Sequence, residues 1–299
     1  MRGLLAGGAG LVVLYTMLVT LSDAITKALA TGYPAAQLYA VSGAVVVALC
    51  LICAPFQAAP VAQPLRTRCP RAMALRAAAT IAATCFFFLA FRHLPFAEVF
   101  LFIGLMPLFA ALMAGPVLGE RVTPAAWGAL WASLLGVICL FPQGMHGIGA
   151  GHAFALLAAL SGTLSIVISR RIGRVESNGL AQVFWPNLAL MAVMAAALPF
   201  VRVPMPLADI ALAAAYGAAL FAARWLLVTA VRRLPAHAVT SLMKLQFVWM
   251  VLVGALAFGE WPAGTTYAGT AIVIASGLFL AYEAPLRAWA SARRRGQPA

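Results

Sequence analysis

The chain has 299 residues, of which 64% are hydrophobic and only 9% are charged, and its formal net charge is +13. Soluble domains carry about 25% charged residues, so this composition excludes an ordinary water-soluble fold. The positive charges are spread over short loops, which is typical of cytoplasmic loops of membrane proteins and argues against a nucleic-acid partner.

Unalternating apolar runs of about 20 residues are long enough to cross a bilayer as helices, whereas barrel strands would alternate. The sequence therefore predicts an all-α polytopic membrane protein with ten transmembrane helices, embedded in the lipid bilayer. Several of the predicted helices begin at or near a proline, where the missing N–H costs nothing. The predicted spans are residues 4–29, 34–54, 73–91, 95–117, 124–142, 150–169, 178–200, 208–231, 236–258 and 263–283.

The distribution of Arg and Lys predicts the orientation of these helices. With the N-terminus inside, most basic residues fall in inner loops and tails, and only Arg92 and Arg202 fall in outer loops. Cytoplasmic loops carry an excess of basic residues. We therefore expect a multi-pass protein of the inner (plasma) membrane with both termini cytoplasmic.

One stretch of the sequence recurs in similar form later in the chain. Residues 90–121 and 230–261 match at nine of 32 positions in one register. The shared positions include an Arg-x-Leu-Pro turn and a Gly-Glu stop, which chance matches between Ala- and Leu-rich helices do not easily produce. This repeat signature consists of Pro95, Pro235, Gly119, Glu120, Gly259 and Glu260.

The duplication predicts the domain organisation. We expect a first five-helix repeat at 1–145, a second at 146–285, and a basic cytoplasmic tail at 286–299. Because five is an odd number, the second repeat enters the membrane from the opposite side. Such inverted repeats recur in secondary transporters, which bind substrate near the midplane between the repeats.

The doubled helix and the ten-span pattern resemble the EamA-type members of the drug/metabolite transporter superfamily. The segment HLPFAEVFLFIGLMPLFAALMAGPVLGERVTPAAWGALWASLLGVICL carries the resemblance in the first half, with Pro107 inside the helix. In the second half, Gly259, Glu260 and Gly277 match. The motif Ser-Asp-Ala-Ile-Thr-Lys at 22–27 is similar to the branch that includes S-adenosylmethionine uptake carriers. The resemblance implies a ten-helix transporter.

Ionisable groups inside spans are costly in lipid and are therefore candidates for substrate binding or translocation. Asp23 and Lys27 stand four residues apart on the first helix, so they can pair with each other, or Lys27 can extend to the interface. Glu98 begins the fourth helix and is either a proton or cation acceptor or a carboxylate stabilised by the helix dipole.

Lys244 lies deep in the ninth predicted helix, where it is expected to neutralise an acid such as Asp23 or to hold a substrate carboxylate. Gln246 follows it on a different face of the helix. Arg224 either binds an anionic group or extends to the inner surface.

The cluster at Trp185 and Asn187 surrounds Pro186, which either exposes a backbone carbonyl to the cavity or forms a packing kink. The repetition of Glu120 and Glu260 indicates a structural role, such as accepting bonds from a following helix start. No metal-ligand motif or nucleotide-binding glycine loop is present, so no metal and no cofactor are expected.

These features predict a secondary transporter of a small polar metabolite, such as an amino acid or related amine, working as an exporter or exchanger by alternating access, with protons as a possible coupling ion. An S-adenosylmethionine or nucleoside-like uptake carrier is the alternative within this class. A membrane scaffold or an enzyme for lipid-linked substrates is the alternative of another class, but the dispersed acids do not form a catalytic cluster, so no enzyme is expected. A monomer or weak homodimer is expected.

Overall fold

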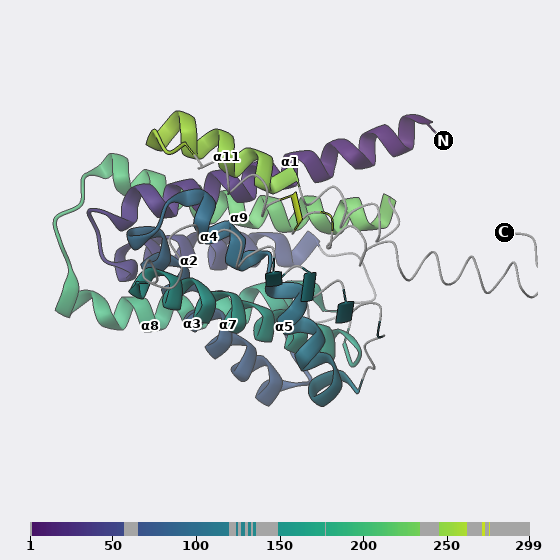
Figure 1. The fold of residues 1–299 in the computed structure, drawn as a ribbon. Coiled ribbons are helices and arrows are strands. Elements are labelled where there is room, and N and C mark those ends of the chain that lie inside the picture. The colour runs from purple at the N-terminus through teal and green to yellow at the C-terminus, as the bar shows by residue number, and fades with distance from the viewer. Residues whose placement is uncertain are drawn as a thin grey trace, which may run out of the picture.

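The computed structural model describes residues 2–56, 65–119, 149–176, 178–233 and 245–261, with single positions between 124 and 135 and at 271, 272 and 275. Within these residues the structure is a bundle of long helices (Figure 1). The helices are α1 (Arg2–Ala30), α2 (Ala35–Cys53), α3 (Pro70–His93), α4 (Phe96–Ile103), α5 (Met106–Met113), α7 (Ala150–Gly173), α8 (Gly179–Val201), α9 (Leu207–Arg233) and α11 (Leu245–Phe258).

Six described helices are long and apolar enough to cross a membrane, namely α1, α2, α3, α7, α8 and α9. This confirms an all-helical, multi-pass membrane architecture. Their bounds lie within a few residues of the predicted spans, because apolar runs and flanking prolines fix where a helix begins and ends. The predicted spans 124–142 and 263–283, and the first part of 236–258, lie outside the described residues or are described only at single positions.

The predicted span over 95–117 is helical in the structure but is interrupted locally. The structure divides it into α4, α5 and a π-helical turn over Ala114–Leu118, with a turn at Gly104 and Leu105 between the first two pieces. Pro107 explains the break, because it has no N–H to donate to the carbonyl four residues earlier and its ring crowds that carbonyl.

The main contacts between helices form a closed circuit. Following neighbours in turn, α1 contacts α9, α9 contacts α2, α2 contacts α8, α8 contacts α3, α3 contacts α7, α7 contacts α4, α4 contacts α11, and α11 contacts α1. Each step passes between a helix from residues 2–113 and a helix from residues 150–258. The two halves of the chain are therefore interleaved rather than set side by side.

Helix α2 is held tightly between α8 and α9 by two glycines. A Cβ atom at Gly217 of α9 would lie 2.6 Å from the Ser42 carbonyl oxygen, and one at Gly43 of α2 would lie 2.9 Å from the Met191 Cβ atom. Small residues of this kind let helix backbones approach closely in a membrane, where packing replaces the hydrophobic effect.

The two Gly-Glu stops have the same backbone conformation at their glycines. The φ angle is +67° at Gly119 and +66° at Gly259, in the left-handed region that glycine adopts without a Cβ penalty. The structure thus gives two repeat-equivalent residues one conformation, each at the end of a helix.

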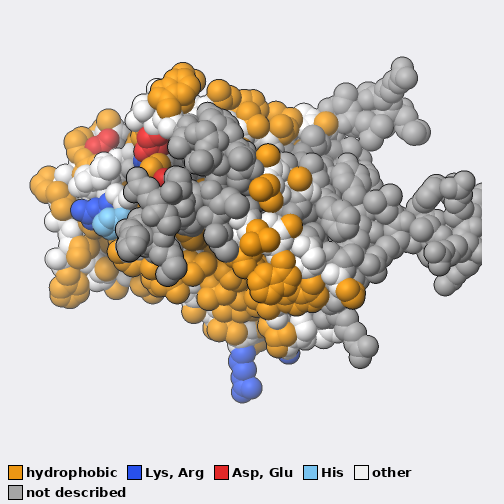
Figure 2. Space-filling model, in the orientation of Figure 1, with side chains coloured by type: hydrophobic (Ala, Val, Ile, Leu, Met, Phe, Trp, Pro, Cys, Tyr) orange, Lys and Arg blue, Asp and Glu red, His pale blue; other side chains and the backbone are white. Residues whose placement is uncertain are grey.

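The outer surface of the bundle is largely apolar (Figure 2). Large hydrophobic side chains are exposed on several helices, among them Leu51, Ile52, Leu75, Ile166 and Leu256. Such a surface suits lipid rather than water. The interior contains polar side chains, and these define the candidate site.

Candidate functional site

Polar side chains from α1 and α9 face each other inside the bundle. Tyr15 and Asp23 come from α1, and Tyr216 and Arg224 come from the neighbouring α9. Both phenols interact electrostatically with both Asp23 and Arg224. The two tyrosines therefore lie in the electric field between an acid and a base.

Tyr39 of α2 extends this cluster across the interior. Its ring centroid lies 5.9 Å from that of Tyr216 and 5.9 Å from that of Phe88 of α3. Its hydroxyl donates to the Thr84 carbonyl of α3 at 3.3 Å. Tyr39 is 1% exposed. Aromatic rings from three helices thus converge between the polar groups.

Asp23 accepts a hydrogen bond from Gln246 Nε2 of α11 at 3.4 Å. A second bond joins the same helices, since Trp249 Nε1 donates to Thr16 Oγ1 at 3.1 Å. Two of the predicted site residues, Asp23 and Gln246, are therefore brought together from the two halves of the chain.

The predicted pairing of Asp23 with Lys27 is not observed. Lys27 instead forms an ion pair with Glu260, and its ammonium group also donates to the Leu94 carbonyl at 3.1 Å. The four-residue spacing allowed the pair on helix geometry alone, but Lys27 is turned toward the end of α11 and lies over the ring of Phe258, 5.2 Å from its centroid.

Glu260 accepts a hydrogen bond from the start of α4, and the helix predicted to follow Glu260 is described only at single positions. Its Oε2 atom accepts from the Phe96 backbone N–H at 2.7 Å, at the first residue of α4. That N–H has no partner within its own helix, and a carboxylate there also opposes the helix dipole. Glu260 therefore joins the ends of α1, α4 and α11.

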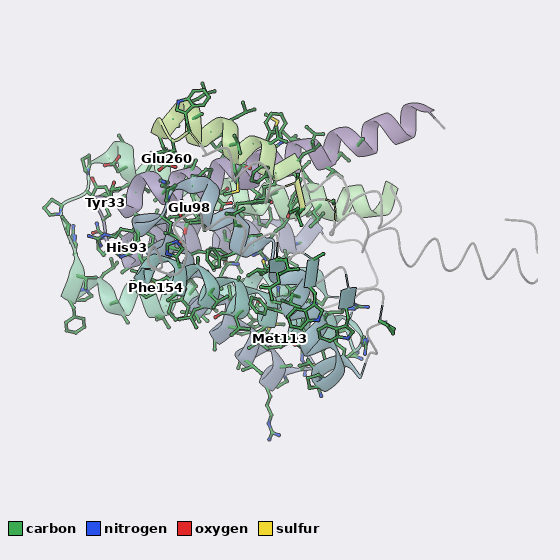
Figure 3. All side chains as sticks on the ribbon, in the orientation of Figure 1. Tyr33, His93, Glu98, Met113, Phe154 and Glu260 are labelled. Carbon is green, nitrogen blue, oxygen red and sulfur yellow. The ribbon has the colours of Figure 1, made fainter. Side chains whose placement is uncertain are left out.

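Glu98 lies in the first turn of α4, close to the bonds that Glu260 forms with Lys27 and with the Phe96 N–H. One carboxylate oxygen lies 3.7 Å from His152 Nε2 of α7. The Glu98 side chain is 42% exposed, and the His152 side chain is 13% exposed. Tyr33, Glu98 and Glu260 all lie toward the same end of the bundle (Figure 3).

Arg76, which the count of basic residues placed with the inner loops although the predicted span 73–91 includes it, lies inside α3, and its side chain reaches α8. Its Nη1 atom donates to the Gln182 backbone carbonyl at 2.6 Å and to the Gln182 side-chain oxygen at 3.0 Å. Ser169 of α7 donates to the same side-chain oxygen at 2.5 Å.

Pro186 explains why a backbone carbonyl of α8 is available to Arg76. A residue at 186 with an N–H would donate to the carbonyl of Gln182, four positions earlier, and proline cannot. The Trp185–Asn187 cluster was predicted either to free a carbonyl or to form a kink. The freed carbonyl is that of Gln182, and it is occupied by an arginine.

Trp185 and Asn187 form hydrogen bonds that do not involve the tyrosines. Trp185 is 39% exposed, and its indole donates to the Leu65 carbonyl at 2.8 Å. Asn187 is buried and donates to the Val183 carbonyl of its own helix at 2.7 Å, at the contact between α8 and α2. Among the other predicted residues, Glu120, Pro235 and Lys244 lie outside the described residues.

A groove of about 480 Å³ lies elsewhere, between α2, α8 and the start of α9. Its rim includes Gln37, whose amide bonds both to the Val203 carbonyl at 2.8 Å and to the Val203 N–H at 3.0 Å. The remaining lining is mostly apolar. We place the candidate site at the interior cluster, because the ionisable groups and aromatic rings from both halves of the chain meet there.

The sequence missed Tyr15, Tyr39, Tyr216, Gln182 and Arg76. Aromatic residues in apolar helices give no signal of which face they occupy, and Arg76 was counted with the basic inner loop. One signal was available for Arg76: it follows Pro70, the first residue of α3, by six positions and so stands well inside the helix.

The fold and the interior cluster define a bundle of membrane helices with a polar centre, and comparisons with known proteins agree with this class. Residues 149–282 match the EamA-like transporter family. A riboflavin transporter of Rhizobium johnstonii is 31% identical over 177 residues, which are 58% of each chain. These matches agree with the resemblance of the sequence to the EamA-type members of the drug/metabolite transporter superfamily.

The alignment thus covers little more than half the length of that curated relative. A solved crystal structure whose description names no function is similar in fold, with a TM-score of 0.61 over 89% of this chain and 93% of its own. Its sequence identity is 21%, so it supports the fold alone.

Proposed function

We propose that the protein is a secondary transporter that moves a small polar metabolite by alternating access between two inverted five-helix repeats. The observation that carries this proposal is the interleaved circuit of helices around a polar interior. Ionisable residues inside a membrane bundle mark substrate or ion pathways, because they are costly in lipid and are retained only where they face a cavity or each other.

The helix contacts have the symmetry that two repeats require. Pair α1 with α7, α2 with α8, α3 with α9 and α5 with α11, which are the helices that the register of the duplication relates. Exchanging the members of every pair converts the contacts α1–α9, α2–α9 and α1–α11 into α7–α3, α8–α3 and α7–α5, all of which are observed, and maps α2–α8 onto itself. This supports a pseudo-two-fold axis through the bundle, with the substrate site on it.

The broken helix at Gly104 supports the same reading. Discontinuous helices at the repeat interface are a recurrent feature of secondary transporters, because their free backbone groups can bind substrate or ions. Alternating access would then involve rocking of the two repeats about the interior cluster, with the Lys27–Glu260 ion pair closing one end.

Our preferred substrate class is an amino acid or a related amine, since the interior offers both an acid, Asp23, and arginines. A riboflavin- or nucleoside-like substrate is the second candidate. It is favoured by the similarity to a riboflavin transporter and by the tyrosines of the interior, whose faces suit planar rings. We place the protein in the plasma membrane with both termini in the cytoplasm, and we include protons as a coupling ion through Asp23 or Glu98.

The proposal is tested by uptake into proteoliposomes containing the purified protein. Radiolabelled amino acids, polyamines, nucleosides, S-adenosylmethionine and riboflavin are compared, each with and without a pH gradient and against empty liposomes. Uptake that saturates and is inhibited by excess unlabelled compound supports a carrier, and a response to the gradient supports proton coupling. Cysteine labelling tests the site separately: a water-soluble reagent that never reaches positions on α1, α4 and α11 next to the cluster would contradict an alternating-access cavity.

A further inference from the structure

We propose that Arg76 and Arg224 together bind the anionic group of the transported molecule, so that the substrate combines a carboxylate or phosphate group with a planar ring. This inference rests on the proposed transport function and assigns a chemical class to its substrate. Arg76 comes from α3 in the first half, and Arg224 comes from α9 in the second.

Neither arginine has a carboxylate partner in the described part of the chain. The five described acids have other contacts: Asp23 with Gln246, Glu98 with His152, Glu176 with the segment 67–68, Asp209 with Tyr33, and Glu260 with Lys27. Among the described residues the side-chain hydrogen bonds of Arg76 go to Gln182, and its Nε atom is buried without a partner there.

Two arginines without acids are expensive in this position. On the lenient insertion scale an arginine costs about 2.5–3.5 kcal/mol at the centre of a span, and the cost falls toward the ends of the span, where Arg76 and Arg224 lie. The two are also close enough to interact with each other electrostatically, which adds repulsion. An anion between them would remove both penalties at once, because guanidinium groups bind carboxylate and phosphate oxygens through paired hydrogen bonds.

The depth of the two residues is consistent with one shared anion. Arg224 lies eight residues after Tyr216 on α9, or about 12 Å along the helix, toward its C-terminal end. Arg76 lies eight residues before Thr84, whose carbonyl binds Tyr39, so it is displaced from the tyrosines by a similar distance along α3. Both residues are half-buried.

The tyrosines supply the second half of the chemistry. Tyr39 and Tyr216 lie beside one another, and the Tyr15 phenol interacts with Arg224. A planar ring can stack on or pack edge-on against these aromatic side chains while its anionic substituent reaches the arginines. A purely apolar, lipid-facing surface would offer neither an aromatic side chain for the planar ring nor an arginine for its anionic substituent.

The test uses two matched pairs of compounds that differ only in the anionic group. Indole-3-acetate is compared with its neutral amide, indole-3-acetamide, and flavin mononucleotide is compared with neutral riboflavin. Binding to the purified full-length protein in detergent is measured by the quenching of intrinsic fluorescence and by the shift in Tm. The first pair reports a carboxylate and the second a phosphate, so the source of the anion is distinguished.

We expect at least one anion to bind roughly tenfold or more tightly than its neutral partner. Arg224→Gln and Arg76→Gln should each weaken that anion by roughly tenfold to a hundredfold, in line with the loss of a charge-assisted hydrogen bond, without weakening the neutral compound. Arg224→Lys should retain part of the affinity. Arg171→Gln, at an exposed position of α7, is the matched control and should change nothing.

The Tm without ligand separates this role from a structural one. For Arg224→Gln, removing a charge without an acidic partner should leave the unliganded Tm unchanged or raise it, whereas a structural arginine would lower it when lost. Arg76→Gln also removes the hydrogen bonds to Gln182, so its unliganded Tm should fall and only its selectivity between anion and neutral compound reports on the proposed role. The inference is overturned if neither anion binds better than its neutral partner, or if both Gln variants bind the anion normally. If the inference fails but proteoliposomes still take up a neutral compound, the transport proposal stands. If they take up none of the compounds, the transport proposal fails as well.

Discussion

Lys27 and Glu260 form an ion pair between the end of α1 and the turn after α11, and so join the first half of the chain to the second. The pair is fixed on both sides by backbone groups, since Lys27 donates to the Leu94 carbonyl and Glu260 accepts from the Phe96 N–H. Four segments therefore meet at one polar point at one end of a largely apolar bundle.

Removing one partner of this pair should destabilise the protein more than removing both. Lys27→Met leaves the Glu260 carboxylate partly buried with only a backbone partner, and we expect a loss of about 1–3 kcal/mol, because Glu260 keeps some contact with solvent. The double variant Lys27→Met with Glu260→Gln should cost less than the sum of the single changes. Melting of the purified variants in detergent measures this double-mutant cycle, and additive losses would show that the two residues do not interact.

Glycine is required at 259 for its backbone conformation. Gly259→Ala places a Cβ atom on a residue with a φ angle of +66°, which should cost about 1–2 kcal/mol. No atom lies within 4 Å of the added Cβ, so the effect isolates backbone strain from packing. Gly10→Ala is the control, since Gly10 lies in α1 with equally open space, and there the change should stabilise by about 0.5–1 kcal/mol. Equal Tm shifts for the two variants would rule out strain at 259.

Pro186→Ala should separate stability from function. The restored N–H can donate to the Gln182 carbonyl, which strengthens α8 and competes with Arg76 for that acceptor. We expect the Tm to be unchanged or higher while the rate of uptake into proteoliposomes falls. Pro199→Ala, in the same helix, restores an N–H without touching Arg76 and serves as the control. A normal uptake rate in Pro186→Ala would mean that the freed carbonyl is not needed for transport.

The hydrogen bond of the Tyr33 phenol should stabilise the loop between α1 and α2 only while the phenol keeps its proton, so this contribution to stability is lost at alkaline pH. Its hydroxyl donates to Asp209 Oδ2 at 2.5 Å, and this hydrogen bond raises the pKa of Tyr33 above its usual value of 10. A pKa raised in the folded state contributes stability that is present below the unfolded value, near pH 10, and is lost as the pH rises through the folded value.

The Tm of the wild type should therefore exceed that of Tyr33→Phe up to about pH 10, and the difference should shrink at higher pH. The measurement is a series of melting curves between pH 8 and 11. A difference that stays constant across this range would show that the hydroxyl contributes through packing rather than through the proton it donates.

The sequence by itself determined where most described helices lie, because about 20 apolar residues must cross lipid as a helix and prolines mark the starts. It also identified Gly119 and Gly259 as equivalent positions, which share one unusual φ angle. It could not foresee the division of α4 from α5, since Pro107 is tolerated inside some membrane helices and breaks others, depending on what compensates the freed carbonyl.

The partners of the charged residues were decided only by the tertiary structure. Spacing along one helix favoured Asp23 with Lys27, yet each is bonded to a residue more than 220 positions away, Gln246 and Glu260. In the same way, the sequence left open whether Arg224 binds an anion or extends to the inner surface, and it gave Arg76 no partner until the packing of α3 against α8 placed it beside Gln182. The reason is physical: a helix fixes which residues share its faces, but only the packing of helices against one another decides which face meets lipid and which meets charge.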